Sequence, residues 1–488
     1  MLIRLAFAIV ILLCIGSPSL LAQSAQEPID LLLDGGTAVT MDPARHIITD
    51  AAIAIRGDSI VAIGSRKDID SRYAPAHRLS TVGQLILPGL INGHTHAAMT
   101  LFRGLGDDLP VHEWLQEYIF PAEARNVDAD FVLWGTRLAA LEMIRSGTTT
   151  FADMYFFADA AAKATRESGM RAVLGETILD SATPDSKTPA DALAYAERFL
   201  KHWQGNALIT PAVAPHSMYL LSPDSLRAAF ALARHYHAPI LIHLSETKRE
   251  VDEERERHGV SPVGYLNQLS LLGRDVTAAH CVWIDAADIA LLVAHRVGCV
   301  HNPSSNMMLG SGVAPVGRMR AAKMRLGLGT DGPASNNDLN LMEEMDLAAK
   351  LQKVWHRDPS ALSAEAALDM ATIGGARALH MESEIGSLEP GKKADLIVLA
   401  LDSPNGVPLY NIYAQIVYAL KSEDVRTVII GGRIVMQDRR ILTLDQAAIV
   451  ARASRYAVTV MKTLKAPQGD RSEPLLPLPD GIYEGPKR

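Results

Sequence analysis

Cysteine is scarce in this sequence, which has three in 488 residues. Cys14 lies in an apolar N-terminal segment, so only Cys281 and Cys299 occur further along the chain. Two cysteines are too few for a disulfide framework in a chain of this size, and whether they form one bridge depends on their separation in the fold. The stability of the protein must therefore come from a hydrophobic core.

The sequence also lacks long basic runs, internal repeats of fixed period and, beyond the N-terminus, apolar stretches long enough to span a bilayer. Its net charge of −8 gives no electrostatic footprint for nucleic acid. With 48% hydrophobic and 21% charged residues, it is neither disordered nor collagen-like. These absences favour a globular enzyme that acts on a small molecule.

The N-terminus has the pattern of a secretory signal peptide over residues 1–22. Arg4 supplies the positive charge, residues 5–15 form the apolar core, and residues 18–22 form the region of small residues that precedes the cleavage site. We therefore expect an exported protein, periplasmic or secreted, without a stable membrane span after cleavage. The alternative is an uncleaved membrane anchor.

Short strand patterns occur near both ends of the remaining chain, at 29–33, 52–55, 60–63, 395–400, 425–430 and 433–436. Neither group can bury a sheet face alone, so 27–85 and 386–445 are predicted to form one small β-sandwich. Residues 446–488 are expected to form a C-terminal helix and a Pro-rich tail. The middle, 86–385, would then be a single inserted domain.

The middle segment alternates short apolar runs with helical patterns, which is typical of a (β/α)8 barrel, an α/β fold. Eight strands are predicted, at 85–91, 148–152, 172–174, 209–214, 239–244, 276–279, 298–301 and 326–329. A doubly wound open sheet is the competing arrangement. The alternating acidic and basic residues of 248–257 are typical of a solvated helix face.

Five side chains that can bind metal or carry protons stand where predicted strands end. His94 and His96 follow the first strand, His243 closes the fifth, His280 follows the sixth and Asp331 follows the eighth. In a barrel these ends share the C-terminal face, where active sites are built. Three neutral imidazoles and a carboxylate are a suitable ligand set for Zn²⁺ or another divalent transition metal.

Longer motifs surround these residues in the same order. They read PGLINGHTH at 88–96, RGL at 103–105, DDLP at 107–110, EWL at 113–115, FPAE at 120–123, HLSET at 243–247, AHC at 279–281, HNPSSN at 301–306 and GTDG at 329–332. With them the chain resembles the amidohydrolase superfamily, in its nucleoside and heteroaromatic deaminase and chlorohydrolase branch. The resemblance covers about 28–445.

The resemblance implies one divalent metal ion per chain, Zn²⁺ first and Fe²⁺ as an alternative, held by residues that match His94, His96, His243 and Asp331. No Lys ends the fourth strand, where relatives with two metals carry a modified lysine. A bound metal lowers the pKa of water. Asp331 would accept a proton from that water, His280 would orient it, and Glu246 would protonate a ring nitrogen of the substrate.

For substrate contacts, the chain is similar to 5-methylthioadenosine/S-adenosylhomocysteine deaminases. That similarity implies a ribose contact by Glu123, packing by Trp114, a nucleoside contact by His216 and a purine contact by Ser335. Residues 175–191 contain Lys187 but no Arg, so the cation that relatives use for the homocysteine carboxylate is missing. A homo-oligomer is left open.

The predicted function is hydrolytic deamination of an adenine nucleoside of the 5-methylthioadenosine, adenosine or S-adenosylhomocysteine type. One alternative keeps the same machinery for a nucleobase such as guanine or cytosine, or for amino- or chlorohydrolysis of an s-triazine. An alternative of another class is an exported nucleoside- or metal-binding protein without turnover. The presence of Glu246, His280 and Asp331 together favours an enzyme.

Overall fold

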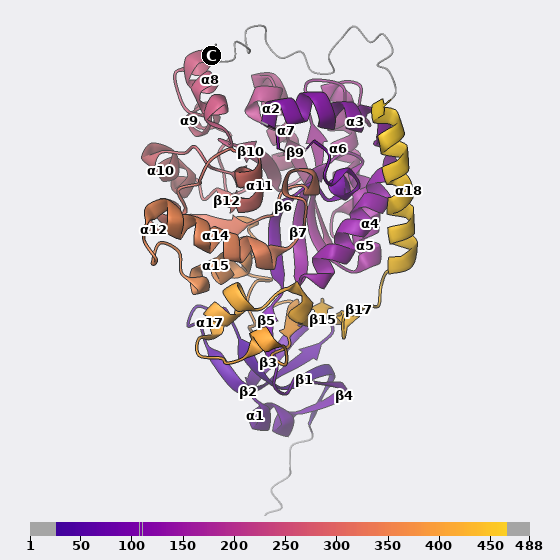
Figure 1. The fold of residues 1–488 in the computed structure, drawn as a ribbon, viewed down its shortest axis with the longest axis vertical. Helices are drawn as coiled ribbons and strands as arrows, with labels where there is room; N and C mark the ends of the chain where they lie inside the picture. Colours follow the sequence, from indigo (N-terminus) through magenta and orange to yellow (C-terminus); the bar gives the residue numbers. More distant parts are fainter. Residues whose placement is uncertain (1–25, 107, 110, 466–488) are drawn as a thin grey trace, which may run out of the picture.

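The computed structural model describes residues 26–106, 108, 109 and 111–465. The predicted signal peptide, Cys14 and the Pro-rich tail beyond Lys465 lie outside these residues. Two sheets organise the described chain: an eight-stranded parallel sheet, and a nine-stranded sheet that lies at one end of it (Figure 1).

The parallel sheet is the predicted (β/α)8 barrel. Its strands are β6 (Leu90–Thr95), β7 (Thr148–Tyr155), β8 (Arg171–Ile178), β9 (Ile209–Pro215), β10 (Ile240–Leu244), β11 (Val276–His280), β12 (Gly298–His301) and β13 (Arg325–Leu328). They are hydrogen-bonded in sequence order from β6 to β13. Across the remaining gap, the Asp331 N–H donates to the His94 carbonyl at 3.0 Å. This bond joins the two ends of the sheet next to the predicted metal ligands.

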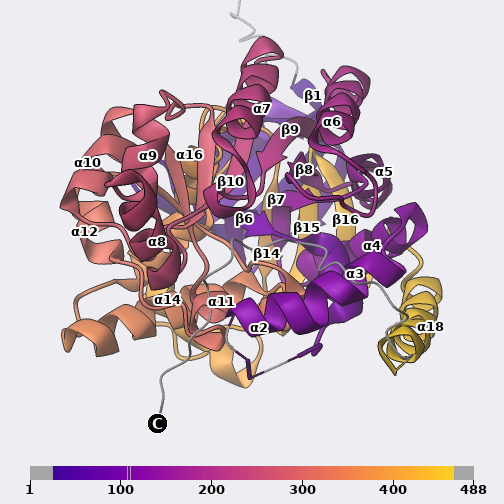
Figure 2. The same ribbon diagram turned by 90° about the horizontal axis from the view of Figure 1, so that it is seen from above.

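Helices surround the barrel, as the view from above shows (Figure 2). The main ones are α4 (Ala129–Arg145), α5 (Ala158–Ser168), α6 (Pro189–Trp203), α7 (Pro223–His235), α8 (Lys248–His258), α9 (Pro262–Gln268), α10 (Ala286–Ala294), α11 (Pro303–Met308), α12 (Val316–Ala321), α14 (Leu341–His356), α15 (Ala364–Ala371) and α16 (Ile373–Ala378). Local signals fix where several begin. The Asp128 carboxylate accepts the Phe131 N–H at the start of α4, and Ser222 with Pro223 caps α7.

The second sheet draws its strands from both ends of the chain, as predicted. They are β1 (Glu27–Val39), β2 (Ile47–Arg56), β3 (Ser59–Ser65), β4 (Tyr73–Ser80), β5 (Leu85–Pro88), β14 (Leu396–Leu399), β15 (Val425–Ile430), β16 (Arg433–Gln437) and β17 (Arg440–Ile441). Hydrogen bonds between β5 and β14 join the two halves. The sequence analysis missed β4 and the short helix α1 (Arg66–Arg72), because β4 is largely exposed and has no apolar alternation.

The predicted strand at 85–91 is two strands in different sheets. β5 belongs to the terminal sheet and ends at Pro88. β6 belongs to the barrel and begins at Leu90, after a single intervening residue. Gly89 lies between them, where a Cβ atom would come within 2.1 Å of Thr149 Oγ1. The apolar run hides this change of sheet because its residues are buried on both sides of Gly89. Gly89 is therefore needed for the close approach of the backbone to β7.

The prediction of a solvated face for residues 248–257 is wrong for part of α8. Glu250, Val251 and Glu254 are buried, with exposed fractions of 7%, 3% and 4%. Positions 250 and 254 are four residues apart and positions 251 and 254 are three apart, so that all three lie on one side of the helix. Two carboxylates of this charged segment therefore face the protein interior.

A buried ion pair joins the barrel to the terminal sheet. Arg171, at the start of β8, donates to Asp395 with its Nε at 2.7 Å and its Nη2 at 3.3 Å. The Asp395 carboxylate also accepts the Gly431 N–H at 2.6 Å. Because both charged side chains are almost fully buried, removal of either one would leave the other without its partner.

The last helix, α18 (Gln446–Lys465), packs against α3 (Phe120–Asn126) and α4 (Figure 1). Arg125 and Asn126 hydrogen-bond to Thr463, and Tyr456 donates to Asp130. In the part of the chain that the structure describes, no helix is long and apolar enough to cross a membrane.

Candidate metal centre and active site

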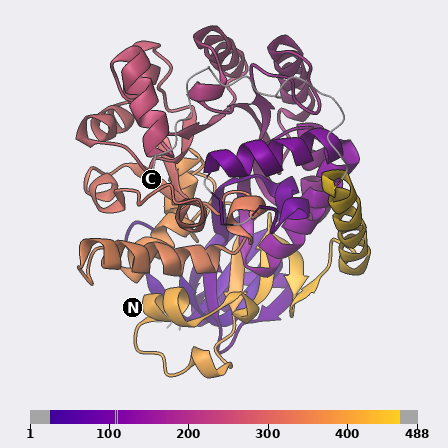
Figure 3. The same ribbon diagram turned by 45° about the horizontal axis from the view of Figure 1, so that its top comes forward.

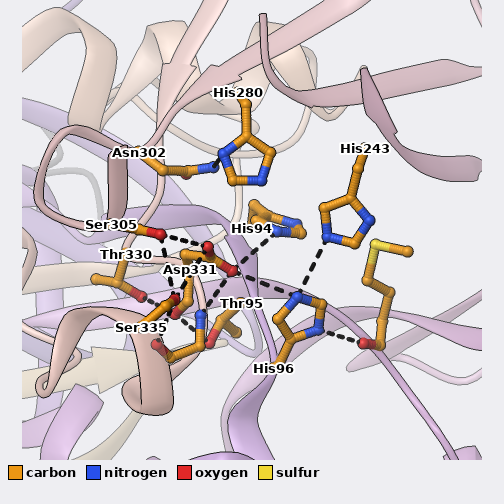
Figure 4. Close-up of polar contacts among 12 residues, drawn as sticks. His94, Thr95, His96, His243, His280, Asn302, Ser305, Thr330, Asp331 and Ser335 are labelled. Carbon is orange, nitrogen blue, oxygen red and sulfur yellow. Dashed lines mark hydrogen bonds and ion pairs between the residues drawn. The ribbon is translucent and has the colours of Figure 1, made fainter. Parts of the chain in front are cut away.

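The predicted metal ligands converge at the C-terminal end of the barrel (Figure 4). His94 lies in β6 and His96 directly follows it, His243 lies in β10, and Asp331 follows β13. The Nε2 atoms of His94 and His96 each lie 3.3 Å from Asp331 Oδ1, and the Nε2 atoms of His96 and His243 are also 3.3 Å apart. Ligand atoms about 2.1 Å from one tetrahedral zinc ion lie about 3.4 Å from one another. The spacing of these atoms fits such an ion.

Hydrogen bonds on the far side of two rings fix which nitrogen faces the centre. His96 Nδ1 donates to the Met154 carbonyl at 2.6 Å, and His243 Nδ1 donates to the His216 carbonyl at 2.9 Å. Each Nε2 is therefore left with a lone pair directed inward. His94 Nε2 is buried and has no hydrogen-bond partner, and burial lowers the pKa of His94 to about 4. Neutral imidazoles with unpaired nitrogens are what a transition metal requires.

The Asp331 carboxylate is held by side chains of two short helices, α11 and α13 (Pro333–Asn336), and by the backbone of the next residue. Ser305 and Ser335 donate to Oδ2 at 2.7 and 3.1 Å, and the Gly332 N–H donates to Oδ1 at 2.7 Å. Burial alone would raise the pKa of Asp331, but His94, whose Nε2 lies 3.3 Å away, and the other surrounding imidazoles hold it well below its usual value. The carboxylate is ionised and oriented toward the imidazoles.

His280 and Glu246 lie beside this centre. His280 Nδ1 is 3.0 Å from Asn306 Oδ1, and its Nε2 is 3.8 Å from Glu246 Oε2. Burial raises the pKa of Glu246. Burial lowers the pKa of His280, but the carboxylates of Glu246 and Asp331 outweigh it, so that the net shift is upward. A buried acid next to an imidazole can hold a proton close to the metal ligands.

A cavity opens onto these groups. Its chemical end is lined by His96, His243, Glu246, His280 and Asp331. The segment that contains α2 (Val111–Glu113), the π-helical turn Trp114–Ile119 and α3 lies across the upper end of the barrel (Figure 3). Its side chains, with Phe156 and Leu179, make the opposite wall apolar. The lining suits a small molecule with an apolar body.

The predicted substrate contacts all line this cavity. Glu123 Oε1 accepts the Tyr155 hydroxyl at 2.7 Å, and burial raises the pKa of Glu123 to about 7. Its second oxygen is free to accept bonds from a ligand. Trp114 is buried and donates to the Leu105 carbonyl at 3.2 Å, so its ring has one fixed orientation.

Two further predicted contacts have roles in the protein itself. Burial lowers the pKa of His216 to about 3, which keeps its ring neutral, and its carbonyl orients His243. Ser335 Oγ donates to Asp331, so a purine contact would have to share this hydroxyl. Both residues are close to the metal ligands as well as to the cavity.

A model of the amidohydrolase family matches residues 85–435. The chain belongs to this family. This amidohydrolase is 45% identical over 441 residues to the 5-methylthioadenosine/S-adenosylhomocysteine deaminase 1 of Syntrophus aciditrophicus, an alignment that covers 90% of this chain and 100% of the relative. A 5-methylthioadenosine/S-adenosylhomocysteine deaminase of Syntrophobacter fumaroxidans is 47% identical and is covered to 98%, with 88% of this chain. The resemblance stated from the motifs is confirmed.

Solved structures agree with the fold of this amidohydrolase. An adenosine deaminase from Xanthomonas campestris, crystallised with bound zinc, has a TM-score of 0.88 and 37% identity, and the match covers 90% of this chain and all of that one. The atrazine chlorohydrolase TrzN from Arthrobacter aurescens has a TM-score of 0.82 over 88% of this chain and all of its own. At 23% identity it supports the fold alone.

Sequence reasoning missed several residues of the amidohydrolase site. Tyr155 closes β7 and contacts Glu123, and its place at a strand end was the available signal. Ser305 and Asn306 belong to the HNPSSN motif but had no predicted role, although they contact Asp331 and His280. Glu250, in the segment predicted to be solvated, accepts the backbone N–H groups of Ser245 and Glu246.

Proposed function

We propose that this amidohydrolase deaminates adenine nucleosides of the 5-methylthioadenosine type, releasing ammonia. The observation that carries the proposal is one cavity with a metal-ligand set and a buried acid at one end and a carboxylate suited to a vicinal diol at the other. An ionised Glu123 can accept two hydrogen bonds from neighbouring ribose hydroxyls. The names of the relatives support the same substrate class.

The metal we propose is a single zinc ion held by His94, His96, His243 and Asp331. When bound, such an ion lowers the pKa of water and polarises it for attack on an electron-poor carbon. Support comes from the unpartnered His94 nitrogen, the inward-facing imidazoles and the zinc in the Xanthomonas campestris structure.

The residues of the chain then move the protons. Glu246 donates a proton to the ring nitrogen beside the amine-bearing carbon, which makes that carbon electrophilic. The oxygen of water forms a bond to this carbon while Asp331 accepts the proton, with His280 holding the oxygen by a hydrogen bond. Asp331 passes its proton to the amino nitrogen and the carbon–nitrogen bond breaks. The remaining hydroxyl proton passes to the Glu246 carboxylate, which restores the acid, and the oxygen becomes a ring carbonyl. One water is consumed and one ammonia is released.

The test is ammonia release from methylthioadenosine, adenosine, S-adenosylhomocysteine, guanine and cytosine, and ammonia or chloride release from a chloro-triazine, by the zinc-loaded protein. We expect turnover of the nucleosides, with S-adenosylhomocysteine the poorest of them because the described cavity lining includes no Lys or Arg. Glu246→Gln should abolish turnover and leave the zinc content unchanged. Activity on free bases or triazines alone would refute the ribose contact. No turnover of any of these compounds would favour a binding protein.

We also propose that the protein is exported after removal of residues 1–22. The positive residue, the apolar core and the small residues before the expected cleavage site support the proposal. N-terminal sequencing of the protein recovered from its native host tests it. A first residue near Gln23 is expected, whereas retention of Met1 would indicate an uncleaved segment.

A further inference from the structure

Glu246 stands on a very short connection. β10 ends at Leu244, and Thr247 already caps α8, so that Ser245 and Glu246 are the whole link between the strand and the helix cap. Ser245 has a φ of 52°, a left-handed conformation that residues other than glycine rarely adopt. Such a conformation persists only when surrounding contacts hold it. The contacts that hold this link therefore determine where the Glu246 side chain begins.

Glu250 supplies two of these contacts. Its Oε1 accepts the Ser245 N–H at 2.9 Å and its Oε2 accepts the Glu246 N–H at 2.8 Å. Glu250 is the third residue of α8, and its own N–H donates to the Thr247 side chain at 3.1 Å. In an ordinary capping box, a Glu at this position would accept the N–H of the cap residue itself. Here the carboxylate reaches past the cap and binds the two preceding N–H groups.

The other side of the link is held by the segment that follows His280. The Ser245 carbonyl accepts the Val282 N–H at 3.0 Å and the Trp283 N–H at 2.9 Å. The backbone that carries Glu246 is thus fixed relative to the strand that carries His280. The carboxylate of Glu250 is buried at 7% exposure, where water competes little for the two N–H groups.

We infer that Glu250 is a positioning residue, whose carboxylate sets the reach of Glu246 toward the substrate by binding the Ser245 and Glu246 amides. This inference rests on the proposed function, in which Glu246 carries the proton. Both oxygens are needed, because each binds a different amide. Glu250 itself contacts neither the metal ligands nor the cavity in the described structure.

The test compares Glu250→Gln with Glu254→Gln. Gln keeps the size of the side chain but turns an N–H donor toward one of the two amides, which loses one hydrogen bond. Glu254 is a matched control, because it is 4% exposed on the same side of α8 and its carboxylate faces His258 at 3.6 Å rather than the link. Each variant is prepared as the full zinc-loaded protein. The measurements are kcat, KM, zinc content and amide hydrogen exchange of the peptide around Ser245.

For Glu250→Gln we expect kcat to fall about 10- to 100-fold, the range for a small displacement of a reacting group, with KM and zinc content unchanged. Exchange around Ser245 should become faster. Glu254→Gln should leave kcat and this exchange as in the unsubstituted protein. A kcat within twofold of the unsubstituted protein for Glu250→Gln, or equal losses in both variants, would overturn the inference.

The two proposals fail in different ways. If the unsubstituted protein released no ammonia from any substrate, the proposed function would fail, and unchanged hydrogen exchange in Glu250→Gln would separately overturn the role of Glu250. If Glu250→Gln does not fold, Glu250→Asp carries the same test. It keeps both oxygens on a side chain one methylene shorter, so the same direction of change in kcat and exchange is expected, and its absence would again overturn the inference.

Discussion

Replacement of Glu123 by Gln should stabilise the protein at alkaline pH and weaken deamination of nucleosides at the same time. Glu123 is buried, and among the described residues its carboxylate accepts the Tyr155 hydroxyl. Burial raises the pKa of this carboxyl from 4.5 to about 7. The folded protein therefore binds this proton more tightly than the unfolded chain, and stability is lost as the pH rises between these two values.

The magnitude follows from that difference. Each pKa unit corresponds to about 1.36 kcal/mol, so ionisation of Glu123 costs the folded state about 3 kcal/mol above pH 7. Gln avoids this cost and keeps an oxygen for the Tyr155 hydroxyl. Urea unfolding at pH 4 should show little difference between Glu123→Gln and the unsubstituted protein, whereas at pH 8.5 the variant should be more stable by about 3 kcal/mol.

The same substitution should lower the activity of the enzyme on nucleosides. Hydrogen bonds from ribose hydroxyls to a charged carboxylate are worth about 1.5–3 kcal/mol, so kcat/KM for methylthioadenosine should fall about 10- to 100-fold. Activity on free adenine, which lacks the ribose, should not change. Glu117→Gln is the control, since it removes the same charge from an exposed position of the neighbouring turn. Equal stability of Glu123→Gln and the unsubstituted protein at pH 8.5 would refute the reasoning.

Three further predictions concern other parts of the molecule. Asp395→Asn should lower the free energy of unfolding by about 3–5 kcal/mol, because it leaves Arg171 buried without its ion pair; a loss below 1 kcal/mol in urea unfolding would contradict this. Removal of the metal with a chelator should abolish ammonia release and lower the melting temperature, and zinc should restore both; a melting temperature indifferent to zinc would argue against the site. Cys281 and Cys299 are free thiols with sulfurs 3.0 Å apart, and this contact together with burial raises the pKa of Cys281 well above its usual value. Iodoacetamide should therefore label both only after denaturation, and rapid labelling of the native protein would be inconsistent with this packing.

The barrel could be predicted from sequence because each strand is a short apolar run and the five residues proposed to bind or flank the metal stand at or next to strand ends. The boundary at Gly89 could not, since the contact that requires a glycine there involves Thr149, which is distant in sequence. The same holds for β4, whose pairing with β1 depends on backbone hydrogen bonds rather than on an apolar pattern.

The sequence predicts those residues of the site that belong to recognisable motifs. His96, His243, Glu246, His280 and Asp331 all line one cavity, and His94 lies 3.3 Å from Asp331 behind them. What the motifs do not contain is the way these residues are held in place. Glu250 looked like one charge among many, and only its contacts with two backbone amides distinguish it from its exposed neighbours.

The packing of α18 on α3 has a consequence for the synthesis of the protein. The last turn of α18 binds Arg125 and Asn126, directly after the Glu123 that lines the cavity. A nascent chain therefore cannot complete this wall until nearly all of its residues have left the ribosome. Any barrel that formed earlier would have its metal ligands in place but an unfinished binding surface. Sequence changes in the last turn of α18 are accordingly a route by which evolution could adjust substrate affinity without altering a residue that touches the ligand.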